Sequence, residues 1–295
     1  GGTMFIDLDG IVNLGNNSSN GATLSLTLDN NGTINFENSD VACCTNIDYF
    51  VSGIWTNNRT INFNFHDGIG EVNISGLDVF NSSDGTINHN FDATGASTKI
   101  THFGFSSFVN EGTFNNISGN AYVDLSLGST FNGTFYAGSS TTTTFTGNDE
   151  VTFTSSSSIA MVNGTLIFDG GPYVIQTSLS AKDVIVNINS TLSGSIPAFV
   201  ETSITNNGAI EFDNLIMGGN SQQTIYGTGT IQKLTIDNFT DVLIQGAQTI
   251  NSELSFSTGK LFTDTNILIL ESAATITNAS ATSYVVGNLQ RNFTT

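Results

Sequence analysis

Arg59-Thr-Ile-Asn-Phe-Asn-Phe65 decides the fold, because its apolar and polar residues alternate strictly and the same phrase returns along the chain. Alternation with a period of two predicts a β-strand with one buried face. The phrase recurs as Gly32-Thr-Ile-Asn-Phe36, Gly85-Thr-Ile-Asn-His-Asn-Phe91 and Gly112-Thr-Phe-Asn-Asn116. A unit of this kind cannot bury its own apolar face alone, so it must stack on copies of itself.

The first apolar residue of each phrase measures the length of the repeat. These markers are Ile34, Ile61, Ile87 and Phe114, at spacings of 27, 26 and 27 residues, and then Leu166, Ile188, Ile210, Ile231 and Ile250, at spacings of 22, 22, 21 and 19. Two or three short strands with their turns fill a repeat of that length. No long stretch has the period of an amphipathic helix, so helical repeats are excluded.

The repeat predicts an all-β chain, namely a parallel β-helix (β-solenoid) of about 11–13 coils of roughly 20–27 residues each. No linker or charge run divides the sequence, so we expect one solenoid domain over residues 1–295. A set of β-sandwiches is the alternative, but that architecture does not require the same phrase at each return. The scarcity of proline agrees with continuous backbone pairing, since proline removes a ladder hydrogen bond.

Aligning one phrase on the next predicts which side chains are buried. With Ile61 set on Ile87, His89 falls opposite Phe63, in an inward position. A slip of one residue would turn the whole set to solvent. We therefore expect a stacked core that contains Ile34, Phe36, Ile61, Phe63, Phe65, Ile87 and Phe91, with His89 in the same stack as Phe63.

Charge limits the partners. Six Lys and Arg residues stand against 25 Asp and Glu residues, which gives a formal net charge of −19. Nucleic acid is excluded as a usual partner, because so few basic residues cannot neutralise a run of phosphates, and anionic lipid is disfavoured for the same reason. No apolar run is long enough to span a membrane. An acidic surface rich in hydroxyls and amides is typical of an extracellular protein.

The C-terminal part of the chain resembles a known class of surface protein. Three segments carry the resemblance: Leu254-Ser-Phe-Ser-Thr-Gly-Lys-Leu-Phe-Thr-Asp-Thr-Asn-Ile-Leu-Ile-Leu270, Ala274-Thr-Ile-Thr-Asn278 and Ser283-Tyr-Val-Val-Gly-Asn-Leu-Gln-Arg291. Over residues 248–291 they look like the pattern of secreted, repeat-rich cell-surface adhesins of Bacteroidetes, which are commonly exported by the type IX secretion system. The resemblance implies an extracellular or cell-surface location and a segment of a longer protein. Its implied partners are cell-surface or secretion-machinery proteins, or surface glycans.

Three classes of function follow. The first is a structural or adhesive segment, such as a stiff stalk or adhesin shaft, whose bare strand edges would favour end-to-end self-association. The second is a glycan- or ice-binding solenoid, since Thr141-Thr-Thr-Thr144 and pairs such as Thr228/Thr230 resemble ice-binding arrays. Those threonines do not keep a common register, which disfavours ice. A polysaccharide lyase or hydrolase is third.

Catalytic chemistry is not expected. A lyase needs a base beside positive charge, and a glycosidase needs two or three carboxylates on one face. The lysines are isolated in the sequence, and the acidic pairs Asp7/Asp9 and Asp149/Glu150 are of a kind that arises by chance in so acidic a chain. We therefore predict that the chain is not an enzyme and that it holds no catalytic or cofactor-binding residue.

Metal binding is not predicted either. His66, His89 and His102 would have to converge to bind a metal, and hydrogen-bonded core or rim histidines are the favoured interpretation. Turns such as Asp67-Gly68 and Asp84-Gly85 could supply oxygen ligands, so incidental calcium is the one exception.

The stretch over residues 40–58 breaks the repeat and holds the unusual side chains. Tyr49 and Trp55 are candidate glycan contacts, because exposed aromatic rings stack on sugars; an aromatic patch that covers a coil junction is the alternative. For Cys43 and Cys44 we favour free thiols over a vicinal disulfide, which would be strained because adjacent Cα atoms lie only ~3.8 Å apart, and place an intermolecular bond last.

Overall fold

The computed structural model is an all-β solenoid of about 11 turns, in which parallel strands pair with their equivalents in the next turn. It describes residues 2–7, 10–15, 22–37, 46–65, 71–91, 100–125, 129–138 and 141–293. The predicted fold class is confirmed. Within these ranges no helix is long and apolar enough to cross a membrane. The chain forms two compact units, Gly1–Gly164 (unit 1) and Thr165–Thr295 (unit 2), while the single domain over residues 1–295 stays a prediction.

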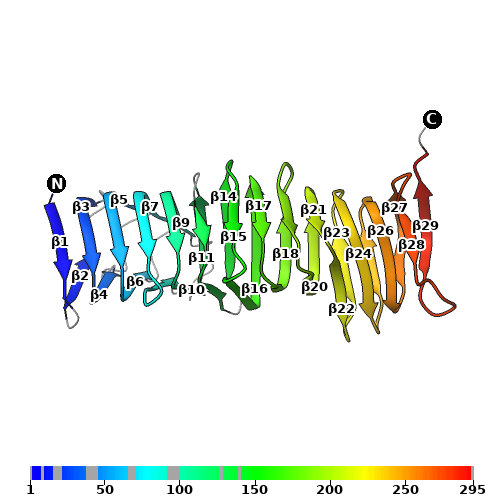
Figure 1. Cartoon of the computed structure of the whole chain (residues 1–295), viewed down its shortest axis with the longest axis horizontal. Helices are drawn as coiled ribbons and strands as arrows, with labels where there is room; N and C mark the ends of the chain where they lie inside the picture. Colours follow the sequence, from blue (N-terminus) through cyan, green and yellow to red (C-terminus); the bar gives the residue numbers. More distant parts are fainter. Residues whose placement is uncertain are drawn as a thin grey trace. The chain divides into compact units, whose positions relative to one another are not determined.

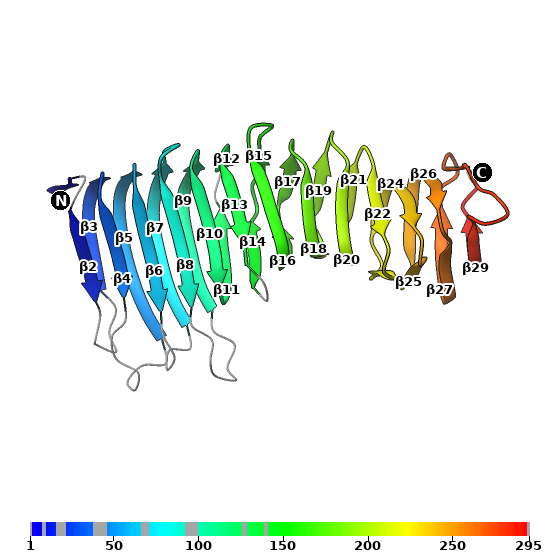
Figure 2. The same ribbon diagram turned by 90° about the horizontal axis from the view of Figure 1, so that it is seen from below.

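Unit 1 is built from more than two rows of parallel strands, because β9 pairs with both β11 and β12 of the next turn. Figure 1 shows β3, β5, β7 and β9 side by side, and Figure 2 shows β4, β6, β8 and β10 as the second row. The strands are β1 (Gly2–Ile6), β2 (Ile11–Gly15), β3 (Ala22–Asn30), β4 (Thr33–Glu37), β5 (Asn46–Asn57), β6 (Thr60–Phe65), β7 (Glu71–Asn81), β8 (Thr86–Phe91), β9 (Ile100–Asn110), β10 (Thr113–Ser118), β11 (Asn120–Leu125), β12 (Thr130–Phe131), β13 (Thr134–Ala137), β14 (Thr142–Gly147), β15 (Val151–Phe153) and β16 (Ser158–Gly170).

The register of the second row matches the repeated phrase. Ile34 pairs with Ile61, Ile61 with Ile87, and Ile87 with Phe114. All seven residues of the predicted core are buried, and none is more than 3% exposed. His89 pairs with Phe63 and is buried in the same stack. The predicted alignment is confirmed, because alternation along each strand turns one set of side chains inward in every turn.

Aromatic rings fill much of the unit 1 core. The rings of Phe131 and Phe153 are stacked, with centroids 4.5 Å apart and an interplanar angle of 13°, and Phe114 stacks on Phe135 at 5.6 Å. Phe108 meets Phe131 edge-on at 5.3 Å. Both geometries are favourable for aromatic pairs, so the core gains ring contacts beyond the burial of area.

Two ladders of asparagine run through unit 1. The inner Asn ladder is buried, and each amide donates to the next: Asn30 Nδ2 to Asn57 Oδ1, Asn57 to Asn81 and Asn81 to Asn110, at 2.7, 2.7 and 2.6 Å. The outer Asn ladder is half-buried and donates the other way: Asn62 Nδ2 to Asn35 Oδ1, Asn88 to Asn62 and Asn115 to Asn88, each at 2.8 Å. The inner ladder satisfies amides that would be costly to bury alone.

Glycine opens the phrase because successive turns approach closely there. A Cβ atom on Gly112 would lie 2.1 Å from the carbonyl oxygen of Gly85, and one on Gly133 would lie 1.9 Å from that of Gly112. The same two oxygens accept hydrogen bonds from the backbone N–H groups of Thr113 and Thr134. A side chain would displace these bonds at Gly112 and Gly133, which explains the Gly-Thr pair there; before β6 Arg59 holds the same place, and its carbonyl oxygen accepts from Thr86 N–H.

Unit 2 repeats the arrangement with an aliphatic core. Leu192, Ile210, Ile231 and Ile250 pair in sequence and are all buried. Its strands are β17 (Pro172–Ile175), β18 (Leu179–Val186), β19 (Thr191–Gly194), β20 (Ala198–Asn206), β21 (Ala209–Phe212), β22 (Leu215–Gly219), β23 (Gln223–Tyr226), β24 (Thr230–Asn238), β25 (Val242–Gln245), β26 (Gln248–Thr258), β27 (Leu261–Leu270), β28 (Thr275–Thr277) and β29 (Val285–Arg291).

One predicted marker is wrong. Ile188 is 71% exposed, and Leu192 takes the core position opposite Ile210. Ile188 lies in a turn closed by a hydrogen bond from Ser190 N to Asn187 O, with Asn189 at a positive φ of 67°. Asparagine tolerates that left-handed conformation, so the chain turns at Ile188 instead of extending through it.

Candidate functional site

The outward side of the second row in unit 1 forms a regular polar surface, which we call the Thr–Asn face. Its first column is Thr33, Thr60, Thr86, Thr113 and Thr134, which pair in register, and its second column is the outer Asn ladder. Parallel pairing repeats each column at ~4.8 Å, and residues two apart on a strand lie ~6.6 Å apart. The face is therefore an array of hydroxyls and amides that repeats in two directions; Figure 2 shows the strands β4, β6, β8 and β10 that carry it.

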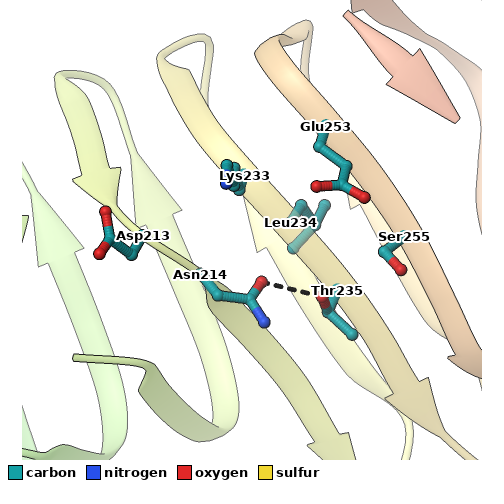
Figure 3. Close-up of a pocket in the computed structure, with 7 residues that line it drawn as sticks. All are labelled: Asp213, Asn214, Lys233, Leu234, Thr235, Glu253 and Ser255. Atoms are coloured by element: carbon teal, nitrogen blue, oxygen red, sulfur yellow. Dashed lines mark hydrogen bonds between the residues drawn. The ribbon is translucent and has the colours of Figure 1, made fainter. Parts of the chain in front are cut away.

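Unit 2 carries a polar pocket of about 250 Å³ on its outward side. Figure 3 shows six of its polar side chains, which come from the segment before β22 and from strands β24 and β26: Asp213, Asn214, Lys233, Thr235, Glu253 and Ser255. Lys233 and Glu253 are direct cross-strand neighbours. The pocket thus places an ammonium group beside carboxylates and hydroxyls.

Hydrogen bonds fix two acceptors of this pocket. Thr277 Oγ1 donates to Glu253 Oε1 at 2.7 Å, and Thr235 Oγ1 donates to Asn214 Oδ1 at 2.8 Å, the bond that Figure 3 marks. The structure shows no ion pair between Lys233 and a described carboxylate. The lysine, the Asn214 amide N–H groups and the second Glu253 oxygen therefore remain able to bind a ligand.

His89 forms a buried polar cluster inside the unit 1 core. Its Nδ1 lies 2.9 Å from Asn116 Oδ1, and its Nε2 lies 2.8 Å from Thr101 Oγ1. Asn116 Nδ2 donates to Thr143 Oγ1, so its oxygen faces the histidine, Nδ1 carries the proton and the Thr101 hydroxyl donates to Nε2. Burial lowers the pKa of His89 to about 4, against the opposing effect of the Asn116 hydrogen bond. The ring is neutral and satisfied.

The histidines do not come together at one site in the part of the chain that the structure describes. His102 lies on β9, where its ring stacks on Tyr122 at 4.9 Å, while its neighbour Thr101 points inward to His89. His66 lies outside the described residues, as does the Asp67-Gly68 turn. No three His, Cys, Asp or Glu side chains gather in the described part of the chain.

The glycan contact predicted for Trp55 is wrong. Trp55 is 1% exposed and stacks on Phe36 at 5.8 Å, so it presents no face to a sugar ring. The reason is register: Trp55 pairs with Leu28 and Val79, which are both core residues. Tyr49 lies on β5 opposite Ile74, and its glycan contact stays a prediction.

The remaining candidate residues are scattered. Asp149 and Glu150 are exposed just before β15, and Asp7 is exposed after β1. Asp9, Cys43 and Cys44 lie outside the described residues, so the thiol state stays a prediction. Asp84 is exposed in the turn between β7 and β8, where Gly85 N donates to Ser82 O.

Sequence reasoning missed both polar surfaces. The threonine of the repeated phrase itself keeps register in every turn from Thr33 to Thr134, and its constant place one residue before each marker was the available signal. The pocket gave no comparable signal, because Asp213, Lys233 and Glu253 come from three different turns. Comparison of the chain with family models, with curated proteins and with solved structures finds no match.

Proposed function

We propose that the chain is a stiff structural or adhesive segment of a secreted or cell-surface protein, without a catalytic centre. The observation that carries the proposal is the continuity of the ladders: each described turn is tied to the next by backbone pairs, by stacked core side chains and, in unit 1, by amide ladders. Most residues thereby serve to build the coils. The acidic surface and the resemblance over residues 248–291 support an extracellular location, with surface proteins, secretion-machinery proteins or glycans as partners.

Pulling the chain by its ends in an optical trap tests the mechanical part of this proposal. Because each turn contacts only its neighbours, we expect a series of steps as turns peel off one by one. A turn of 20–27 residues releases roughly 70–90 Å of chain at ~3.4 Å per residue. Extension without resistance would contradict the shaft function.

Labelling of intact cells with an antibody to this segment tests the location, and labelling only after lysis would contradict it.

A second candidate function is binding to ice, and the Thr–Asn face favours it. The face holds threonines in one register, which is the feature that the Thr-x-Thr pairs lack, and Thr and Asn carry no charge that would hold a disordered hydration shell. We expect thermal hysteresis that Thr86→Tyr abolishes, since a bulky ring breaks the flat array. Thr56→Tyr is the matched control, because Thr56 faces outward on β5, away from the array. Equal hysteresis in both variants, or none in the unaltered chain, would contradict this function.

A further inference from the structure

An exposed aromatic ring lies in line with the polar pocket of unit 2. Phe199, on β20, is 47% exposed although it stands between two buried residues, Ala198 and Val200. A single exposed apolar side chain is ordinary on a protein surface, so exposure alone does not make Phe199 a ligand contact. Its position relative to the pocket, which follows from the strand register, does.

Phe199 and the pocket belong to one outward column. Phe199 pairs with Ile216 on β22, Ile216 with Thr235 on β24, and Thr235 with Ser255 on β26. Thr235 and Ser255 line the pocket. Three strand spacings of ~4.8 Å separate the ring from Ser255, a total of ~14 Å. That length suits a short linear oligomer that lies across the strands better than a single small molecule.

The chemistry of the pocket disfavours an anionic ligand and suits a ligand rich in hydroxyl groups. An anion would meet Asp213 and Glu253 as well as a chain with a net charge of −19, whereas the one like charge that a cation would meet in the pocket is the ammonium group of Lys233. A polyol meets no charge repulsion, because each hydroxyl group can donate to a carboxylate and accept from an ammonium or amide N–H. Sugars combine such hydroxyls with an apolar ring face that packs on an aromatic side chain.

We propose that strands β20, β22, β24 and β26 carry a binding groove for a linear, uncharged glycan, which stacks one sugar ring on Phe199 and hydrogen-bonds to Lys233 and Glu253 in the pocket. The bond from Thr277 holds the Glu253 carboxylate in place and leaves its second oxygen to accept from a sugar hydroxyl. The proposal rests on the adhesive part of the proposed function and names its ligand class. Its test measures glycan binding and does not depend on the stiffness of the chain or on its location. The glycan groove and the proposed function can therefore fail independently.

Affinity electrophoresis of the full chain tests the groove. The chain is run in native gels that contain one soluble polysaccharide each: β-glucan, xylan, galactomannan, hydroxyethyl cellulose or a soluble uncharged chitin derivative as uncharged probes, and alginate or polygalacturonate as anionic probes. We expect retardation by at least one uncharged probe and by neither anionic probe. The dissociation constant for that probe should rise at least tenfold in Phe199→Ala and in Lys233→Ala, and severalfold in Glu253→Gln.

Matched variants separate the groove from general surface effects. Phe239→Ala removes an exposed aromatic ring outside the column, and Lys182→Ala removes an exposed lysine outside the pocket. Both should bind as the unaltered chain does, and all five variants should keep its thermal midpoint, because every altered side chain faces outward. Absence of retardation by every uncharged probe, stronger retardation by the anionic probes, or equal losses in the control variants would overturn the proposal.

Discussion

The imidazole of His89 is held in its neutral form, and protonation at low pH would disrupt its hydrogen bonds. Its Nδ1–H donates to Asn116 Oδ1, and its Nε2 accepts from the Thr101 hydroxyl, inside a stack that includes Phe91 and Phe103. A second proton would place a charge among these rings and deprive the Thr101 hydroxyl of its acceptor. The alignment of the phrases predicted the place of this residue, since it stands where the preceding turns have phenylalanine. The same alignment sets Asn116, two residues after the marker Phe114, opposite His89. It could not predict Thr101, because that residue lies on β9, outside the aligned phrases.

Acid is therefore expected to weaken the fold through His89. The folded pKa of about 4 lies below the ordinary value of 6.5, so the unfolded chain binds more protons between these values. The contribution of the neutral ring is complete above pH 6.5 and is lost as the pH falls towards 4. Of a total of ~3 kcal/mol, about 2 kcal/mol should be lost between pH 7.5 and pH 5.

Urea unfolding of the unaltered chain and of His89→Gln at these two pH values measures the effect. Glutamine keeps one donor and one acceptor but does not titrate, so the stability difference between the two proteins should shrink by about 2 kcal/mol at pH 5. The other histidines are common to both proteins and cancel. A difference that is the same at both pH values would contradict the buried, neutral state.

At the scale of the element, the inner Asn ladder is expected to hold its turns together. Asn57→Ala leaves one Asn30 N–H without its acceptor, while the bond from Asn30 to Thr60 O remains, and leaves Asn81 Oδ1 without its donor, both in a buried site. Two unsatisfied groups should cost about 2–5 kcal/mol of unfolding free energy. The neighbouring Asn58→Ala is the control, because its bonds to Asp29 and Asn31 are half-buried and water can replace them, for a cost below about 1 kcal/mol. Chemical denaturation measures the unfolding free energy of both variants, and hydrogen exchange of β3 to β7 shows where stability is lost. Equal losses of unfolding free energy in the two variants would refute the ladder's contribution.

Strands were predictable where the Thr-Ile-Asn phrase is repeated, and less so where the turns between strands vary in length. The Thr-Ile-Asn strands of unit 1 lie as the alternation predicted, because one buried face fixes the register. Spacing alone misplaced Ile188, since turns differ in length by a few residues and Asn189 can reverse the chain. The same variability hides the pocket: Lys233 faces Glu253 only once the irregular pairing between Ile231 and Lys233 is known. The lengths and conformations of the turns therefore limit what can be predicted from the sequence, while the identity of the strands does not.

At the scale of the whole molecule, composition and repetition were enough to predict a parallel solenoid. They were not enough to predict that the chain forms two compact units, whose described cores are packed by different types of side chain. Ring pairs such as Phe131 and Phe153 pack unit 1, while columns such as Leu215, Leu234 and Leu254 pack unit 2. An inward position accepts any apolar side chain that fits its neighbours, so the pattern specifies burial without specifying which packing results.

The opposed ladders of unit 1 have an electrostatic consequence. Each primary amide is a small dipole, and a file of amides that donate in one direction adds up as the peptide groups of an α-helix do. The inner file, in which Asn30 donates to Asn57, points one way, and the outer file, in which Asn62 donates to Asn35, points the other. Their fields oppose each other over the turns that they share. A helix gains opposite partial charges at its termini, whereas the amides of such a stack of turns add less polarity from end to end when the stack grows by duplication.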